Sequence, residues 1–132
     1  MLSEKDFFDR LLEKYADETG EDIPSEGIGY YLEYFLNNYP NEKLGLPITR
    51  KIAARLIHEF MLNVLKLEDQ DWGDAAKLKD IYDCRVCSNA IAQVYVRGII
   101  PASRENVFGL GDTLTEAEAD EILDRFAGIL HY

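Results

Sequence analysis

The chain has 132 residues, of which 47% are hydrophobic, and its 25 acidic side chains outnumber 14 basic ones to give a net charge of −11. This length suits one packed core, so we expect residues 1–132 to form a single domain. The negative charge argues against direct binding to nucleic acid or to an anionic membrane surface. No apolar run approaches the roughly 20 residues that cross a bilayer. Residues 1–6 lack a basic segment followed by an apolar one, so we expect no secretion signal and a cytoplasmic protein.

Apolar residues at helical spacing predict the first two helices. The N-terminal helix covers about residues 3–18, with Ser3 as its cap. A short second helix covers about residues 27–38, and a loop over 40–47 follows. Aromatic side chains cluster in and just after this second helix: Tyr30, Tyr31, Tyr34, Phe35 and Tyr39. We expect this stripe to be core and rim, with stacking on sugar rings as the alternative.

A long helix is predicted from about residue 49 to 66, followed by an acidic connection over 67–76. His58 falls among charged residues of that helix, so we expect it to face solvent. The acids of the connection are similar to a calcium-binding loop, but Gly73 stands where an oxygen ligand is needed and the final glutamate is missing. A solvated linker is therefore the expected reading.

Two more helices complete the chain. The first covers about residues 83–97 and ends at Gly98, because glycine readily takes the left-handed conformation that stops a helix. A loop over 101–112 leads to the last helix, about Thr115–Leu130, in which Thr115 and Glu118 form a capping box. The pattern as a whole predicts an all-α, compact bundle of about five helices.

The helix–loop–helix order occurs twice. Ile48-Thr49-Arg50 opens a helix in the first copy, and Leu114-Thr115-Glu116 takes the same place in the second. The second copy has further short motifs in a fixed order: Asp80-Ile81, Ala90-Ile91, Gly98-Ile99-Ile100 and the loop aromatic Phe108. In this order and spacing the chain resembles S-layer homology repeats, bacterial modules that typically hold surface proteins on cell-wall polysaccharide. The resemblance is close over about 80–126, within a repeat spanning 80–130, and degenerate over about 22–66.

The chain also departs from that family. S-layer homology domains usually have three repeats, whereas two are visible here. We therefore expect either that the N-terminal helix, residues 1–20, fills the missing place or that two chains associate as a homodimer. Val86 stands where the family favours tryptophan, and Glu116 stands where it places arginine.

Arg50 is the strongest candidate for a ligand-binding residue. It lies in the first turn of its helix, where the helix dipole disfavours a cation by about 0.3–1 kcal/mol. The resemblance implies that Arg50 grips an acidic group, such as a pyruvylated wall sugar, with Lys51 and Arg55 adding charge. The loop that begins at Gly98 is expected to form a second wall of this site. The alternative is a surface arginine paired with one of many nearby acids.

The two cysteines, Cys84 and Cys87, are expected to be buried thiols, with a metal or redox site as the alternative. Structural zinc needs four ligands, and the remaining candidates, His58 and His131, are isolated in the sequence. No set of nucleophile, base and orienting group is visible. We therefore expect no enzyme activity, no metal and no cofactor.

Two functions follow as expectations. The first is a non-catalytic S-layer homology-like module that binds acidic secondary cell-wall polysaccharide, although members of that family usually lie at the cell surface. The alternative is an intracellular acidic protein-interaction factor. Its charge of −11 suits a basic partner, such as a nucleic-acid-binding protein.

Overall fold

The computed structural model describes residues 2–22 and 45–130, and every regular element in these two ranges is helical. These two ranges contain four α-helices and one short 3-10 helix: α1 (Glu4–Thr19), α3 (Arg50–Asn63), η2 (Gly73–Lys77), α4 (Ser88–Val96) and α5 (Glu116–Ile129). The all-α prediction is confirmed. The helix expected over 27–38, with its aromatic cluster, lies outside the described residues.

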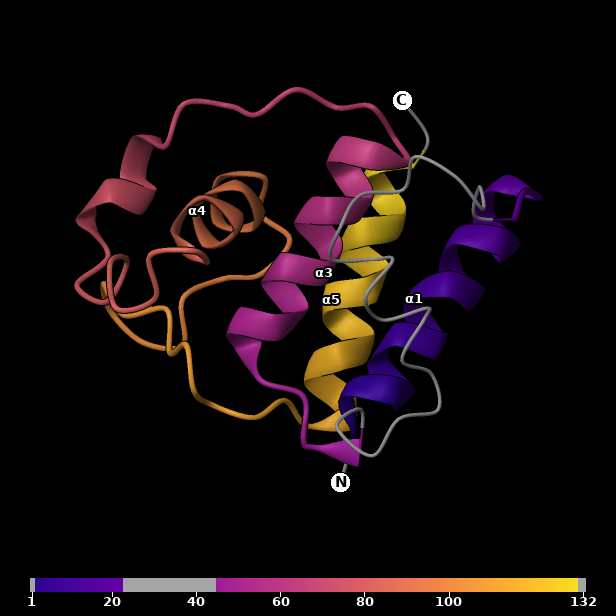
Figure 1. The fold of residues 1–132 in the computed structure, drawn as a ribbon, viewed down its shortest axis with the longest axis horizontal. Helices are drawn as coiled ribbons and strands as arrows, with labels where there is room; N and C mark the ends of the chain where they lie inside the picture. Colours follow the sequence, from indigo (N-terminus) through magenta and orange to yellow (C-terminus); the bar gives the residue numbers. More distant parts are fainter. Residues whose placement is uncertain (1, 23–44, 131–132) are drawn as a thin grey trace.

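Three of the helices are packed against one another and the fourth lies to one side (Figure 1). α1 packs against both α3 and α5, and α4 packs against the other side of α3. The N-terminal helix is thus part of the bundle. The long connection from the end of α3 runs past α4 before the chain enters it (Figure 1).

The helix starts follow from local side-chain chemistry. Ser3 and Asp6 form a capping box on α1, and Thr115 and Glu118 form another on α5. The Thr49 hydroxyl accepts a hydrogen bond from the backbone N–H of Ile52, which caps α3. These starts confirm the sequence-based predictions. The predicted end of α4 is also confirmed, because Gly98 follows the helix with φ of 73°.

The start of α4 was predicted wrongly. The helix begins at Ser88 rather than near residue 83, and the preceding segment is wound into tighter turns. Its backbone N–H groups bond three residues back, as Cys87 does to Cys84 at 3.1 Å. The Ser88 hydroxyl supports these turns by bonding the carbonyl of Ile81 at 2.7 Å and approaching that of Cys84 at 3.0 Å. Serine competes in this way with the regular helical pattern.

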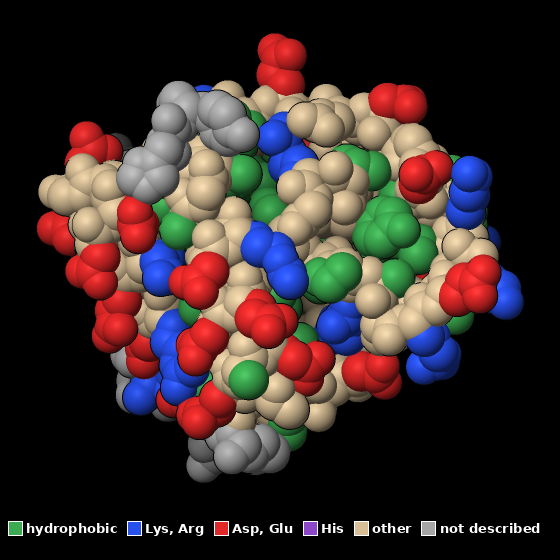
Figure 2. All heavy atoms as spheres, turned by 180° about the vertical axis from the view of Figure 1, so that it is seen from behind, with side chains coloured by type: hydrophobic (Ala, Val, Ile, Leu, Met, Phe, Trp, Pro, Cys, Tyr) green, Lys and Arg blue, Asp and Glu red, His purple; other side chains and the backbone are tan. Residues whose placement is uncertain are grey.

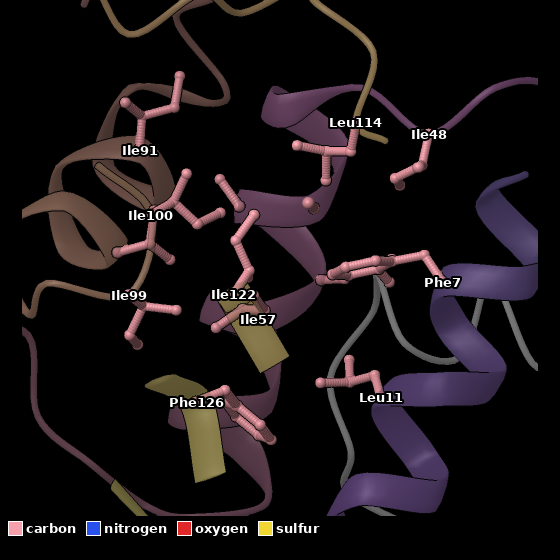
Figure 3. Close-up of a cluster of buried hydrophobic side chains, with 14 of the residues drawn as sticks. Phe7, Leu11, Ile48, Ile57, Ile91, Ile99, Ile100, Leu114, Ile122 and Phe126 are labelled. Atoms are coloured by element: carbon pink, nitrogen blue, oxygen red, sulfur yellow. The ribbon is translucent and has the colours of Figure 1, made fainter. Parts of the chain in front are cut away.

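The core lies between the four helices (Figure 3). Its central contacts are edge-to-face aromatic pairs: Phe60 of α3 lies 5.0 Å from Tyr15 of α1 and 5.6 Å from Phe126 of α5, measured between ring centroids. This geometry is the one that aromatic rings prefer. On the α4 side, aliphatic side chains including Ile91, Ile99 and Ile100 complete the core, as Figure 3 shows.

The segments that open α3 and α5 lie side by side. The N–H of Leu114 donates to the carbonyl of Ile48 at 3.1 Å, and the N–H of Arg50 donates to that of Asp112 at 2.9 Å. An isolated antiparallel bridge joins Thr49 to Thr113. The two stretches that match each other in the sequence are therefore in direct contact, which fixes the ends of both helices together.

Candidate functional site

Arg50 lies inside the protein and is only 5% exposed. Its Nε donates to the carbonyl of Phe108 at 2.7 Å, and a terminal nitrogen donates to the carbonyl of Pro101. The guanidinium also lies 5.0 Å from the Phe108 ring centroid and 3.9 Å from Glu118 Oε2. Burial lowers the pKa of Arg50, while the charges of Glu118 and Asp112 oppose that shift. The expectation that Arg50 faces an external anion is therefore corrected, because its side chain is buried and two of its nitrogen atoms donate to carbonyls of the loop.

Asp80 holds the same loop from the other side. Its two carboxylate oxygens accept hydrogen bonds from the backbone N–H groups of Phe108 at 2.9 Å and Gly109 at 2.8 Å. Burial by itself would raise the pKa of Asp80, but these hydrogen bonds outweigh it and hold the pKa below its usual value. Arg50 and Asp80 together fix the loop over 101–112 as part of the scaffold.

The other expected ligand residues are spread over the structure. Lys51 is partly buried, and its backbone N–H donates to the carbonyl of Leu110 at 3.1 Å. Gly98 is exposed at the end of α4. Arg55 is partly buried and lines a hollow on the surface together with residues of α4. Of the four expected ligand residues, Arg55 is the one that lines this hollow.

His58 is buried, which corrects the expectation that it faces solvent. Its Nε2 lies 2.8 Å from Asp69 Oδ1, and Asn89 Nδ2 donates to the other oxygen of Asp69 at 2.9 Å. Burial would raise the pKa of Asp69, but the bonds from His58 and Asn89 hold it below its usual value. The acidic connection is thus attached to α3 and α4 and is not a freely solvated linker.

A polar stripe on α4 fixes the rest of this connection. Asn89, Gln93 and Arg97 are spaced by four residues and so lie on one side of the helix and its cap. Gln93 forms two 2.8 Å hydrogen bonds with the backbone of Gln70, and Arg97 donates to the carbonyl of Glu68 at 2.8 Å. Sequence reasoning missed this stripe. The stripe could have been predicted, because its three polar residues stand at helical spacing in a segment that is otherwise mostly apolar.

Trp72 lies within this connection and is partly buried at the surface. The indole Nε1 donates to Asn89 Oδ1 at 3.0 Å, so the ring has a fixed orientation. The ring of Tyr82 lies 5.9 Å away between centroids, at an interplanar angle of 37°. These two aromatic residues line a pocket of about 520 Å³ together with Arg85, Ser88 and Asn89. We call it the Trp72 pocket.

A second, smaller hollow lies next to it. It has a volume of about 220 Å³ and shares one lining residue, Asn89, with the Trp72 pocket; its other lining residues are Arg55, His58, Glu59, Val86 and Ala90. Tyr82 is 66% exposed and Val86 is 76% exposed. We call the two hollows together with residues 82–86 the docking face.

The surface elsewhere has a different character. Arg10 of α1 pairs with Glu116 and Asp120 of α5, and Lys14 pairs with Asp124. In Figure 2, acidic and basic side chains are mixed on the side of the view where α1 lies, whereas hydrophobic side chains reach the surface on the opposite side. Such exposed ion pairs contribute little to stability, typically about 0.2–1 kcal/mol.

Cys84 and Cys87 are joined by a disulfide bond, which corrects the prediction of two buried thiols. Cys87 is buried at the cap of α4, whereas Cys84 is only partly buried. The two residues between them, Arg85 and Val86, are both exposed and line the two hollows of the docking face. The disulfide therefore closes the turn that forms the middle of this face.

Comparison of the chain with protein-family models, curated proteins and solved structures finds no match. In residues 2–22 and 45–130, no three His, Cys, Asp or Glu side chains are placed to hold a metal ion together. Over the same residues, none of the helices combines the length and the apolar character that crossing a membrane requires.

Proposed function

We propose that the chain is a non-catalytic binding module that docks a protein partner on the docking face. One observation carries this proposal: Tyr82 and Val86, two large and strongly exposed apolar side chains, flank Arg85 beside two hollows. Exposed apolar groups that are clustered in this way mark interaction sites on soluble proteins. Trp, Tyr and Arg are also the residue types that dominate binding energy in protein interfaces.

The side chains of the docking face indicate what kind of surface its partner should have. Within the described part of the chain Arg85 forms no ion pair, although the protein has 25 acidic residues. A matching surface would thus bring apolar side chains to Tyr82 and Val86 and a carboxylate or carbonyl oxygen to the guanidinium. The net charge of −11 favours the approach of a partner whose own surface is basic, such as a nucleic-acid-binding protein.

A matched pair of variants tests this proposal. Val86→Asp places a charge in the docking face, while Leu46→Asp places the same charge at another large apolar residue, 58% exposed, that lines neither hollow. The partner should co-purify with wild-type protein and with Leu46→Asp but not with Val86→Asp. Equal recovery with both variants would reject the docking face.

A second candidate, an acidic saccharide, is favoured by the shape of the Trp72 pocket. Two tilted aromatic rings beside an arginine offer stacking for a sugar ring and a donor for its carboxylate, in a volume of ligand size. This candidate keeps the function implied by the S-layer homology resemblance but gives Arg85 the role expected of Arg50.

The saccharide candidate has its own test. Titration with purified acidic cell-wall polysaccharide should change the fluorescence of Trp72, the single tryptophan of the chain, and Arg85→Gln should abolish the change. Saturable binding that survives Val86→Asp but not Arg85→Gln would favour the saccharide over the protein partner. No fluorescence change with wild-type protein rejects it.

A further inference from the structure

The two cysteines of the Cys84–Cys87 disulfide differ in burial. Cys84 is partly buried and is flanked by exposed residues on both sides, whereas Cys87 is 2% exposed. Cys84 is therefore the more exposed end of the bond, although its side chain also packs against the core. Thiol–disulfide exchange depends on access, and on which sulfur is attacked.

The fold around the disulfide does not depend on that bond alone. The Ser88 hydroxyl bonds the carbonyl of Ile81, and the backbone N–H of Cys87 bonds that of Cys84. The bond also closes a very short loop, the kind that constrains the unfolded chain least. Breaking it should leave the helices in place and relax only the turn of residues 84–87.

The helix that follows favours a leaving thiolate at Cys87. This residue is the N-cap of α4, a helix of nine residues, and its side chain makes no capping hydrogen bond. The positive end of a helix dipole favours a negative charge, such as that of a thiolate, placed there. The more exposed residue is thus Cys84, and attack there releases the Cys87 thiolate at the start of α4.

We infer that Cys84–Cys87 is a reversible thiol-exchange site for low-molecular-weight thiols. A thiolate attacks Cys84 Sγ, a mixed disulfide forms there, and the electron pair of the broken S–S bond goes to Cys87 Sγ. A second thiolate then attacks the sulfur of the small thiol in the mixed disulfide and releases Cys84 as a thiolate. The protein gains two electrons, and two small thiols leave as one oxidised disulfide.

Exchange at this site changes the docking face. Arg85 and Val86 lie between the cysteines, so reduction frees the turn that presents both side chains. Reduced protein should therefore bind its partner more weakly than oxidised protein. This consequence depends on the proposed function, whereas the exchange chemistry does not.

Reaction of the native, full chain with reduced glutathione tests the exchange directly. After acid quenching, mass spectrometry should find glutathione on Cys84, while the helical circular dichroism is unchanged and the Trp72 fluorescence shifts reversibly. A disulfide that resists glutathione until the protein is denatured would overturn the inference, as would an adduct on Cys87.

Two single variants provide an independent measurement. With oxidised glutathione, Cys87→Ser should form an adduct at its more exposed Cys84 faster than Cys84→Ser does at its buried Cys87. The reverse order of rates contradicts the inference. If exchange proceeds as expected but neither redox form binds a partner, the proposed function fails and the exchange site stands.

Discussion

The side chain of Arg50 and the backbone of Phe108, 58 positions apart in the chain, are joined by a 2.7 Å hydrogen bond, and the guanidinium also lies 5.0 Å from the Phe108 ring centroid. Asp80 accepts from the N–H of the same residue at 2.9 Å. Phe108 is thus held through both of its backbone groups by side chains of opposite charge. This arrangement ties the buried residues of the loop, Phe108–Leu110, to the core.

Arg50→Met should destabilise the protein without affecting binding. The variant keeps an apolar stem but leaves the buried carbonyl of Phe108 and that of Pro101 without their donor. A loss of about 2–3 kcal/mol in the free energy of unfolding is expected for charged hydrogen bonds of this kind. Urea unfolding measures it. Unchanged stability together with lost binding would restore Arg50 as a ligand residue.

Asp80 should make stability depend on pH. Its folded-state pKa is depressed, so its stabilising contribution is present above the unfolded value, about 3.9, and is lost as the pH falls through the folded-state pKa. Asp80→Asn should therefore be less stable than wild type at pH 7, and the gap should narrow as the pH falls from about 5 to 3. Chemical unfolding at a series of pH values checks this. A gap that stays constant or widens toward low pH would contradict it.

Replacement by alanine should have opposite effects on stability at two glycines of the chain. Gly109 has φ of 85°, and an added Cβ would lie 2.6 Å from Asp112 Oδ2 and 2.7 Å from Ser103 Oγ. Gly109→Ala should cost about 1–3 kcal/mol because a strained conformation is forced on alanine. Gly128, in α5, has open space around its Cβ position, so Gly128→Ala should gain about 0.5–1 kcal/mol. Thermal unfolding of both variants should shift in opposite directions, and a shared direction would contradict the description of the loop.

Gln93→Leu should release the segment that carries Trp72. Its two hydrogen bonds to Gln70 would be lost, which leaves a backbone N–H and a carbonyl without their side-chain partner. The expected cost is about 1–3 kcal/mol, with a red shift of tryptophan emission as the indole becomes more exposed. Lys77→Ala is the control, because it removes only an exposed ion pair and should change little. An unshifted emission in Gln93→Leu would show that Trp72 is held by other contacts.

The helix boundaries that could be predicted were those set by local chemistry. The caps at Ser3, Thr49 and Thr115 act within three residues, so the sequence pattern alone identifies them. The start of α4 was missed because it depends on the Ser88 side chain, which bonds backward to Ile81 and favours turns over a regular helix.

The surroundings of the charged residues could not be predicted in the same way. The position of Arg50 in its own helix suggested an external ligand, but its partners come from a loop more than 50 positions later. His58 lies on a side of α3 that is polar in sequence, yet the connection carrying Asp69 covers it. A helical pattern shows which side of a helix a residue occupies, and the paths of later loops decide whether that side reaches water.

The location of the docking face can be measured by backbone hydrogen exchange of the full chain with and without its captured partner. We predict slower exchange on binding over residues 69–72 and 80–90, which include Trp72, Tyr82 and the turn between the cysteines. Protection confined to the first turn of α3 and to the loop after Gly98 would contradict the assignment of this face.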